Sequence, residues 1–331
     1  MMRAFSLLAV FVACICVTVA AVWSFADAES SGSRSTPAHT ERIVSNSPAE
    51  SALQIHSEIT EPAKVFQTSN VFAQFPDRGF GGGFGRGRYR GDPRESDLKN
   101  DWEVEPGFEQ DVFRFARVKY TSWGDGYGGR GKWAVDWPDS DLNLPYRLQE
   151  LTSLKVHPQG AIVELTDENL ADFPFLYIVE PGSMTLSDEE VLGLRKYLLN
   201  GGFLMVDDFW GDDEWFTFYH EIKRVFPDRE PEELPLEHEI FHLVYDLKEK
   251  PIIIGIGAWM HGHHTERHDA QEAHYKGIFD DKGRMMAVIC HNTDLGDGWE
   301  REGVDERYFK EYSERFAYPL GINIITYAMT H

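Results

Sequence analysis

The chain has 331 residues and contains 55 Asp and Glu against 32 Lys and Arg, which gives a net charge of −23. Most of the excess acid follows residue 110. Such a surface repels phosphate backbones and anionic lipid, so nucleic acid is not an expected partner. After the first 28 residues Cys290 is the remaining cysteine, which excludes an intramolecular disulfide in that part of the chain.

The N-terminus has the layout of a secretory signal. Arg3 is followed by an uncharged stretch over residues 4–23, and Ala26-Asp27-Ala28 provides a small-x-small cleavage pattern. The apolar stretch is also long enough to span a bilayer, so an uncleaved membrane anchor is the alternative for residues 1–28. Both readings predict export to the periplasm or beyond. A cell-envelope protein or a small neutral or cationic ligand is then the expected partner, with membrane contact through the N-terminal segment alone.

Residues 29–110 have the composition of a disordered linker. They are rich in Ser, Gly and Pro, contain few spaced apolar residues and include the string RGFGGGFGRGRYR at 78–90. We interpret this stretch as a tether. An alternating apolar pattern begins with VFRFARVKY at 112–120, so we place a single domain at residues 111–331.

The domain alternates between strand-like and helix-like segments. A capping box from Ser187 to Glu190 opens one helix, and Gly201 with Gly202 ends it. The other segments are assigned by apolar periodicity. Strands are predicted at 112–120, 161–165, 175–179, 203–206, 252–256 and 285–291, and helices at 144–154, 187–199, 215–226 and 317–329. This order predicts a mostly parallel, doubly wound sheet between two helical layers, a flavodoxin-like α/β fold.

Four strings of the domain carry a resemblance. They are WPDSDLN at 137–143, RLQELTS at 147–153, GGFLMVDDFWG at 201–211 and HNTDLGDGWE at 291–300. In this order they resemble the bacterial domain-of-unknown-function family numbered 4159, over residues 112–331. The resemblance implies a fold similar to the class I glutamine-amidotransferase-like group, which includes trehalose-utilisation-like proteins. It implies no particular activity, because one fold hosts unrelated chemistries.

Amidotransferase chemistry is not expected. Those enzymes use a cysteine at a strand-to-helix elbow, activated by a His and an acid. Cys290 lies instead in the apolar run MMAVIC without neighbouring glycines, and we predict that it is a buried, inert core residue. The sequence also contains no G-x-S-x-G string, so serine-hydrolase chemistry lacks its usual motif.

Acidic residues follow two predicted core strands. Asp207 and Asp208 come directly after FLMV, and Asp294, Asp297 and Glu300 follow MMAVICH in a stretch that we expect to be a glycine-containing loop. Ligands of open parallel sheets bind beyond the carboxyl ends of the strands, so we expect these acids to share one site. They could bind a divalent metal, act as acid and base or hold a ligand; capping of turns or helices is the alternative.

Residues 238–242, His-Glu-Ile-Phe-His, match the H-E-x-x-H zinc motif. Apolar residues alternate from Phe241 to Leu247, which favours a strand, and a strand holds His238 and His242 too far apart for one metal. We therefore expect His238 alone to face the acids, as a metal ligand or proton carrier. The candidate metal set is Asp207, Asp208, His238 and Asp294.

Arg147 is a further candidate, because a guanidinium can clamp an anionic group; pairing with Asp139 or Asp141 is the structural alternative. The His-rich stretch 261–274 could bind a transition metal but is more typical of a solvated loop. Two hypotheses follow. The first is an exported ligand- or partner-binding domain without amidotransferase activity, and the second is a metal-assisted hydrolase that uses the acids and His238.

Overall fold

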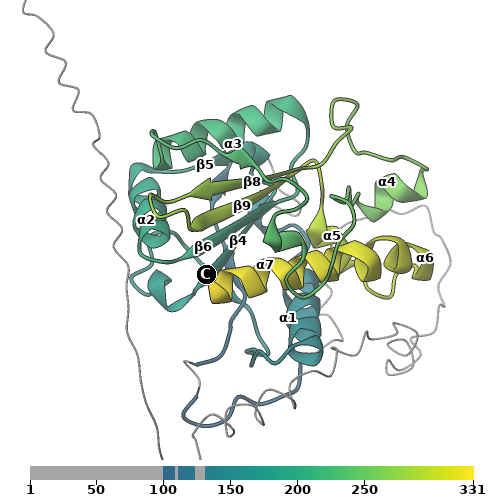
Figure 1. Ribbon diagram of the computed structural model, residues 1–331, viewed down its shortest axis with the longest axis horizontal. Coiled ribbons are helices and arrows are strands. Elements are labelled where there is room, and N and C mark those ends of the chain that lie inside the picture. Colours follow the sequence, from purple (N-terminus) through teal and green to yellow (C-terminus); the bar gives the residue numbers. More distant parts are fainter. Residues whose placement is uncertain (1–99, 109–110, 124–130) are drawn as a thin grey trace, which may run out of the picture. The chain divides into compact units, whose positions relative to one another are not determined.

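The sheet at the centre of the molecule has seven strands in the order β3-β1-β4-β6-β9-β8-β7 (Figure 1). The computed structural model describes residues 100–108, 111–123 and 131–331, all within the unit Pro76–His331. The predicted signal and nearly all of the predicted linker lie outside these residues. Within the described part of the chain, no helix has the length and apolar character needed to cross a bilayer.

The strands from β3 to β9 in this order are parallel, and β8 and β7 continue the sheet in antiparallel fashion. The bounds are β1 (Ala116–Val118), β3 (Ala161–Val163), β4 (Phe175–Val179), β6 (Phe203–Asp207), β7 (Glu232–Glu233), β8 (His274–Phe279) and β9 (Met285–His291). Strands β2 (Thr121–Ser122) and β5 (Met184–Thr185) form a separate pair. The central strands β4, β6 and β9 are buried along their whole length, as is typical of parallel sheets covered on both faces.

Helices cover both faces of the sheet, with α3 on one side of the strands and α1 with α7 on the other (Figure 1). The longer helices are α1 (Asp139–Leu151), α2 (Asp188–Leu199), α3 (Gly211–Val225) and α7 (Tyr318–Thr330). The shorter ones are α4 (Ile256–Met260), α5 (Leu295–Glu300), α6 (Glu306–Tyr308) and the 3-10 helices η3 (Lys132–Ala134), η4 (Leu170–Asp172), η5 (Pro181–Ser183) and η6 (Glu239–Phe241). A π-helical stretch, η7 (Phe309–Ala317), leads into α7.

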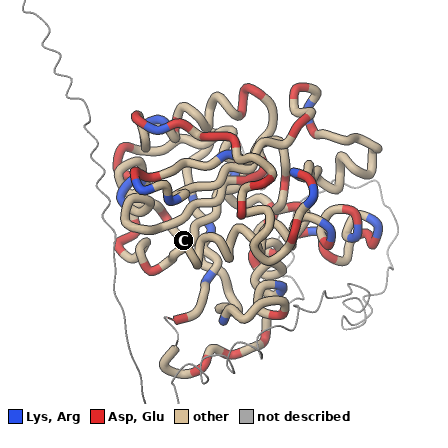
Figure 2. The backbone as a smooth tube through the Cα atoms, viewed as in Figure 1, with Lys and Arg blue, Asp and Glu red and all other residues tan. Residues whose placement is uncertain are grey.

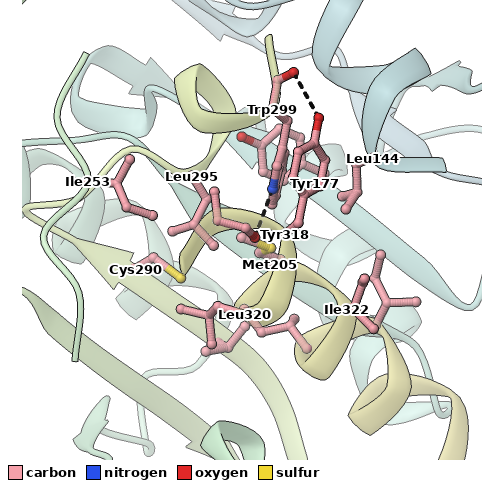
Figure 3. Close-up of a cluster of buried hydrophobic side chains, with 14 of the residues drawn as sticks. Leu144, Tyr177, Met205, Ile253, Cys290, Leu295, Trp299, Tyr318, Leu320 and Ile322 are labelled. Atoms are coloured by element: carbon pink, nitrogen blue, oxygen red, sulfur yellow. Dashed lines mark hydrogen bonds between the residues drawn. The ribbon is translucent and has the colours of Figure 1, made fainter. Parts of the chain in front are cut away.

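Two apolar cores result from the alternation of side chains along the strands. Tyr177 and Met205, which are register partners, belong to the core shared with α1, α5 and α7. Ile178 and Val206, the next pair, belong to the core beneath α2 and α3. Figure 3 shows the first core, in which the ring centroids of Tyr177 and Trp299 lie 5.8 Å apart. The predicted three-layer, flavodoxin-like α/β class is therefore confirmed.

The helix signals in the sequence are also confirmed at α2. The hydroxyl of Ser187 accepts from the Glu190 backbone N–H at 3.2 Å, and the Glu190 carboxylate accepts from the Ser187 N–H at 2.7 Å. These two bonds satisfy amides that have no partner within the helix. Cys290 is fully buried in the first core, as predicted, and burial raises the pKa of its thiol well above the ordinary value.

Two of the predicted strands are wrong. At 252–256 the chain is irregular up to Ile256, where α4 begins, and within the described residues it pairs with a loop: the Ile253 N–H donates to the Thr293 hydroxyl at 3.0 Å, and the Ile253 carbonyl accepts from the Asp294 N–H at 2.9 Å. The segment 238–247 is η6 followed by turns, not an alternating strand. Strand β8, which the sequence analysis did not predict, takes the place beside β9.

Candidate metal centre

Left-handed backbone marks the edge of the sheet where the parallel strands end. The residue directly after each of the neighbouring strands β4, β6 and β9 has a positive φ: Glu180 (48°), Asp208 (57°) and Asn292 (61°). Asp136, in the turn before α1, has the same conformation, with φ 62°. Positive φ is uncommon for residues other than glycine, and it turns the chain sharply where each strand ends.

Six carboxyl groups, five of them buried and one partly exposed, gather at this edge, and we call them the acid cluster. They belong to Asp136, Asp207, Asp208, Asp294, Asp297 and Glu300. Five of them match the expectation that the acids after β6 and β9 come together. The stretch predicted to be a loop is instead α5, with Asp294 as its N-cap.

Within the acid cluster, two groups of three have the spacing of metal ligands. The first carboxylate group is Asp136, Asp208 and Asp294, and the second carboxylate group is Asp136, Asp297 and Glu300. In each group, one oxygen of every member lies within 4.8 Å of the others. Asp136 belongs to both groups.

The hydrogen bonds of the first group come from neutral donors. The Trp210 indole N–H donates to Asp208 Oδ1 at 2.9 Å, and the Asp297 backbone N–H donates to Asp294 Oδ1 at 2.7 Å. Asp136 Oδ2 is buried and has no hydrogen-bond partner among the described residues. A buried carboxylate oxygen without a partner is costly, so this atom indicates a missing ligand.

Asp207, the last residue of β6, lies beneath the first group. Its Oδ2 accepts from the Tyr177 hydroxyl at 3.1 Å and from the Gly296 N–H at 3.0 Å. Its Oδ1 is buried and, within the described part of the chain, also lacks a partner. Burial raises the pKa of Asp207 to about 7, against the opposing effect of backbone hydrogen bonds from Leu295 and Gly296.

Burial, together with crowding of the carboxyls, also raises the pKa values of Asp136, Asp208, Asp294 and Glu300. Burial raises the pKa of Asp136 to about 8, and the charge of Asp297 adds to this effect. The pKa of Glu300 rises to about 10 through burial and the nearby Asp136. The pKa values of Asp208 and Asp294 lie well above the ordinary value, again mainly because of burial. Without a cation, the acid cluster therefore holds protons at neutral pH.

Arg117, which the sequence analysis did not select, fixes the position of Asp136. It is fully buried in β1, and its Nε lies 3.0 Å from both carboxylate oxygens of Asp141. It also donates to the carbonyls of Trp133 and Val135, at 3.1 and 3.0 Å. These bonds hold the segment that carries Asp136 against the sheet. In the string VFRFARVKY, Arg117 lies on the same strand face as Phe113 and Phe115, and a charged residue on this apolar face was the signal for its role.

Arg147 does not lie in the acid cluster. It pairs with Glu302, and its guanidinium stacks on the rings of Tyr318 and Phe309 at 5.3 and 5.7 Å. Asp141, which was considered as its partner, pairs with Arg117 instead. The position of Arg147 is therefore that of a packing and ion-pairing residue of α1.

His238 is also placed elsewhere, which corrects its expected position. Its ring centroid lies 5.9 Å from that of Tyr327, and Tyr327 lies 5.9 Å from Phe203, the first residue of β6. Asp207 is the last residue of the same strand, so His238 is at the opposite edge of the sheet. His238 is therefore too far from these acids to be a ligand in the candidate metal set.

Two other histidines that the sequence singled out have partners outside the acid cluster. Both ring nitrogens of His242 are engaged, Nδ1 with Asp246 at 2.7 Å and Nε2 with the Leu236 carbonyl at 2.7 Å. In the His-rich stretch, His261 contacts the Gly257 carbonyl. Neither carboxylate group includes a histidine, so the ligands that this edge offers are oxygens.

The acid cluster is packed rather than open. A cavity of about 460 Å³ lies beside the edge strand β3, lined by residues that include Trp137, Ile162 and Phe173, and no member of the acid cluster lines it. The acid cluster contains unpartnered buried oxygens that require a ligand, whereas none of the residues lining the cavity has such an atom. A small ion fits this packing better than an organic molecule.

Figure 2 shows that acidic residues outnumber basic ones along the described backbone. Two basic side chains near the acid cluster are paired with acids around it, Lys132 with Glu180 and Arg267 with Glu214. These acids are partly exposed, so a rim of acidic side chains in contact with solvent lies beside the acid cluster.

A comparison with protein families finds a match that covers this region of the chain. Residues 114–329 match the model of a family described as a domain of unknown function, DUF4159. The match includes all six members of the acid cluster. A search of curated proteins finds no match to the chain. Because the family model covers more than half of the sequence, the chain belongs to the DUF4159 family.

Proposed function

We propose that the domain binds a divalent metal cation at the first carboxylate group and uses it to hold a ligand or partner. The observation that carries this proposal is Asp136 Oδ2, a buried oxygen without a partner among the described residues, on a carboxylate that has an oxygen within 4.8 Å of oxygens of Asp208 and Asp294. Three carboxylates without nitrogen or sulfur ligands favour a hard cation such as Ca²⁺, Mg²⁺ or Mn²⁺.

Electrostatics supports the same proposal. The hydrogen bonds of Asp208 and Asp294 come from an indole and an amide N–H, which carry no net charge. Burying three carboxylates together is unfavourable unless protons or cations compensate them. A divalent cation would replace the protons and provide the missing ligand of Asp136.

The cellular setting is part of the proposal and rests on the N-terminal sequence. An exported domain would meet Ca²⁺ at concentrations that suit the weak sites of extracellular modules. The domain would then act as a cation-dependent binding module of the cell envelope, without amidotransferase activity. The fully buried Cys290, with its raised thiol pKa, supports the absence of a cysteine nucleophile.

Asp207 favours a second candidate, metal-assisted hydrolysis. Its Oδ1 is buried, has no hydrogen-bond partner among the described residues and lies in the acid cluster, and a carboxylate in such a position can act as a general base. In this role, Asp207 would accept the proton of a cation-bound water. Hydrolysis of model esters that requires both Mn²⁺ and Asp207, and is lost in Asp207→Asn, would establish this candidate.

Calorimetric titration of the full chain with Ca²⁺, Mg²⁺ and Mn²⁺ after treatment with EDTA tests the main proposal. We expect binding of at least one of these cations, and at least about tenfold weaker binding in Asp208→Asn, which removes one charged ligand. Asn tolerates the left-handed backbone at this position, so the fold should persist. Asp281→Asn is the matched control, because its side chain is 90% exposed. Absence of binding, or equal weakening in both variants, would refute the proposal.

A further inference from the structure

We infer that the acid cluster holds two divalent cations, bridged by the carboxylate of Asp136. This inference rests on the proposed function, because the first cation is the one proposed above. The second cation would be bound by the second carboxylate group, Asp136, Asp297 and Glu300.

The geometry of the two groups supports a shared ligand. Asp136 is the member common to both, and the other ligands of each group are different residues. A carboxylate has two oxygens and can offer one to each of two cations. Cations in such paired sites lie about 3.5–4 Å apart, a separation that one bridging carboxylate can span.

The second group is built on one face of α5. Asp297 and Glu300 are three residues apart in this helix, so their side chains project on the same side. The Ile256 N–H donates to Asp297 Oδ2 at 2.5 Å, which fixes the orientation of this carboxylate. Glu300 Oε2 is buried and, among the described residues, has no partner with hydrogen-bond geometry. The second group therefore has one buried oxygen without a hydrogen bond, besides the carboxylate that it shares with the first group.

Arg301 makes the two cation positions unequal. Its Nε donates to Asp297 Oδ1 at 2.8 Å, and its Nη2 lies 2.6 Å from Glu300 Oε2, although without hydrogen-bond alignment. The guanidinium supplies one positive charge to a group of three carboxylates. The second cation must therefore share its ligands with Arg301, and it binds more weakly than the first.

Equilibrium dialysis of the full chain against Mn²⁺, followed by metal analysis and electron paramagnetic resonance, tests this inference. We expect two Mn²⁺ per chain at saturation and a spectrum broadened by coupling between two close ions. Glu300→Gln should retain one Mn²⁺ and lose the coupling, whereas Asp136→Asn should weaken both sites. Glu306→Gln, with a side chain 56% exposed before substitution, is the control and should keep two coupled ions.

Each outcome separates the two proposals. A single Mn²⁺ that depends on Asp208 would overturn the second site and leave the proposed function intact. Two ions without magnetic coupling, or two ions retained in Glu300→Gln, would overturn the bridge by Asp136. No bound Mn²⁺, Mg²⁺ or Ca²⁺ would overturn the proposed function and the inference together. Thermal unfolding of each variant verifies that it is folded before these results are compared.

Discussion

Replacing Asp136 by Asn should make the stability of the cation-free domain less dependent on pH. Asn has nearly the same shape, tolerates the φ of 62° at this position and cannot ionise. Burial raises the pKa of Asp136 to about 8, and the charge of Asp297 adds to this effect. A carboxyl whose pKa is higher in the folded state keeps its proton in the folded protein and loses it on unfolding.

The magnitude follows from proton linkage. Between about pH 5 and about pH 7, the folded protein holds about one more proton at Asp136 than the unfolded chain. Each pH unit in this range lowers the free energy of unfolding by about 1.4 kcal/mol. Over the whole range from about pH 5 to about pH 7, the decrease is therefore about 2.7 kcal/mol. The contribution is fully present below about pH 4, decreases as the pH rises and levels off above the folded pKa.

Urea unfolding in the presence of EDTA, followed by tryptophan fluorescence at the two pH values, measures this effect. From about pH 5 to about pH 7, the free energy of unfolding of the wild-type chain should fall by about 2.7 kcal/mol more than that of Asp136→Asn. The difference is somewhat smaller if neighbouring carboxyls share the proton. Asp281→Asn, at an exposed position, should follow the wild type. An equal pH dependence of wild type and Asp136→Asn would refute the argument that Asp136 is protonated in the folded domain.

Two further predictions concern buried groups around the site. Arg117→Met leaves Asp141 buried without its guanidinium partner and should lower the free energy of unfolding by about 3–5 kcal/mol; a loss below about 1 kcal/mol in urea unfolding would contradict the role assigned to this pair. Cys290, fully buried and with a raised thiol pKa, should react with a disulfide reagent on the order of 100-fold more slowly in the native chain than in the unfolded chain; comparable rates in the two states would show that it is accessible.

The central layer of the fold could be predicted because its strands are continuous apolar runs. FLYIV, FLMV and MMAVICH leave no polar face for solvent, and each became a buried strand of the parallel sheet. The run IIIGI has the same composition but pairs with the loop at Thr293 and Asp294 instead of a strand. The amino-acid composition of a segment indicates that it is buried, but it does not indicate which other segment its backbone pairs with. Strand β8 was missed for a different reason: its string HYKGIF has no continuous apolar run, although its partner β9 follows after a short turn.

Five members of the acid cluster could be located because each follows a strand that the sequence identifies. Asp136 could not, since it precedes a helix and reaches the strand ends only through the bonds that Arg117 makes with its neighbours. His238 was placed incorrectly because an alternating pattern suggested a strand where the chain forms η6. The rule that ligands bind beyond the carboxyl ends of parallel strands therefore identifies residues that directly follow a strand. It does not identify residues that a tertiary contact places beside the strand ends.

The left-handed residues at the strand ends have a consequence for protein engineering. Glycine adopts positive φ without steric cost, so Glu180→Gly or Asp208→Gly could relieve about 1 kcal/mol of backbone strain at each position. Either change would also remove a carboxylate from the edge where the cation is proposed to bind. In this domain, thermostability and the proposed binding therefore compete for the same positions. Variants for heat resistance are better sought at exposed apolar residues, such as Leu192 and Phe216, where substitution leaves the strand ends unchanged.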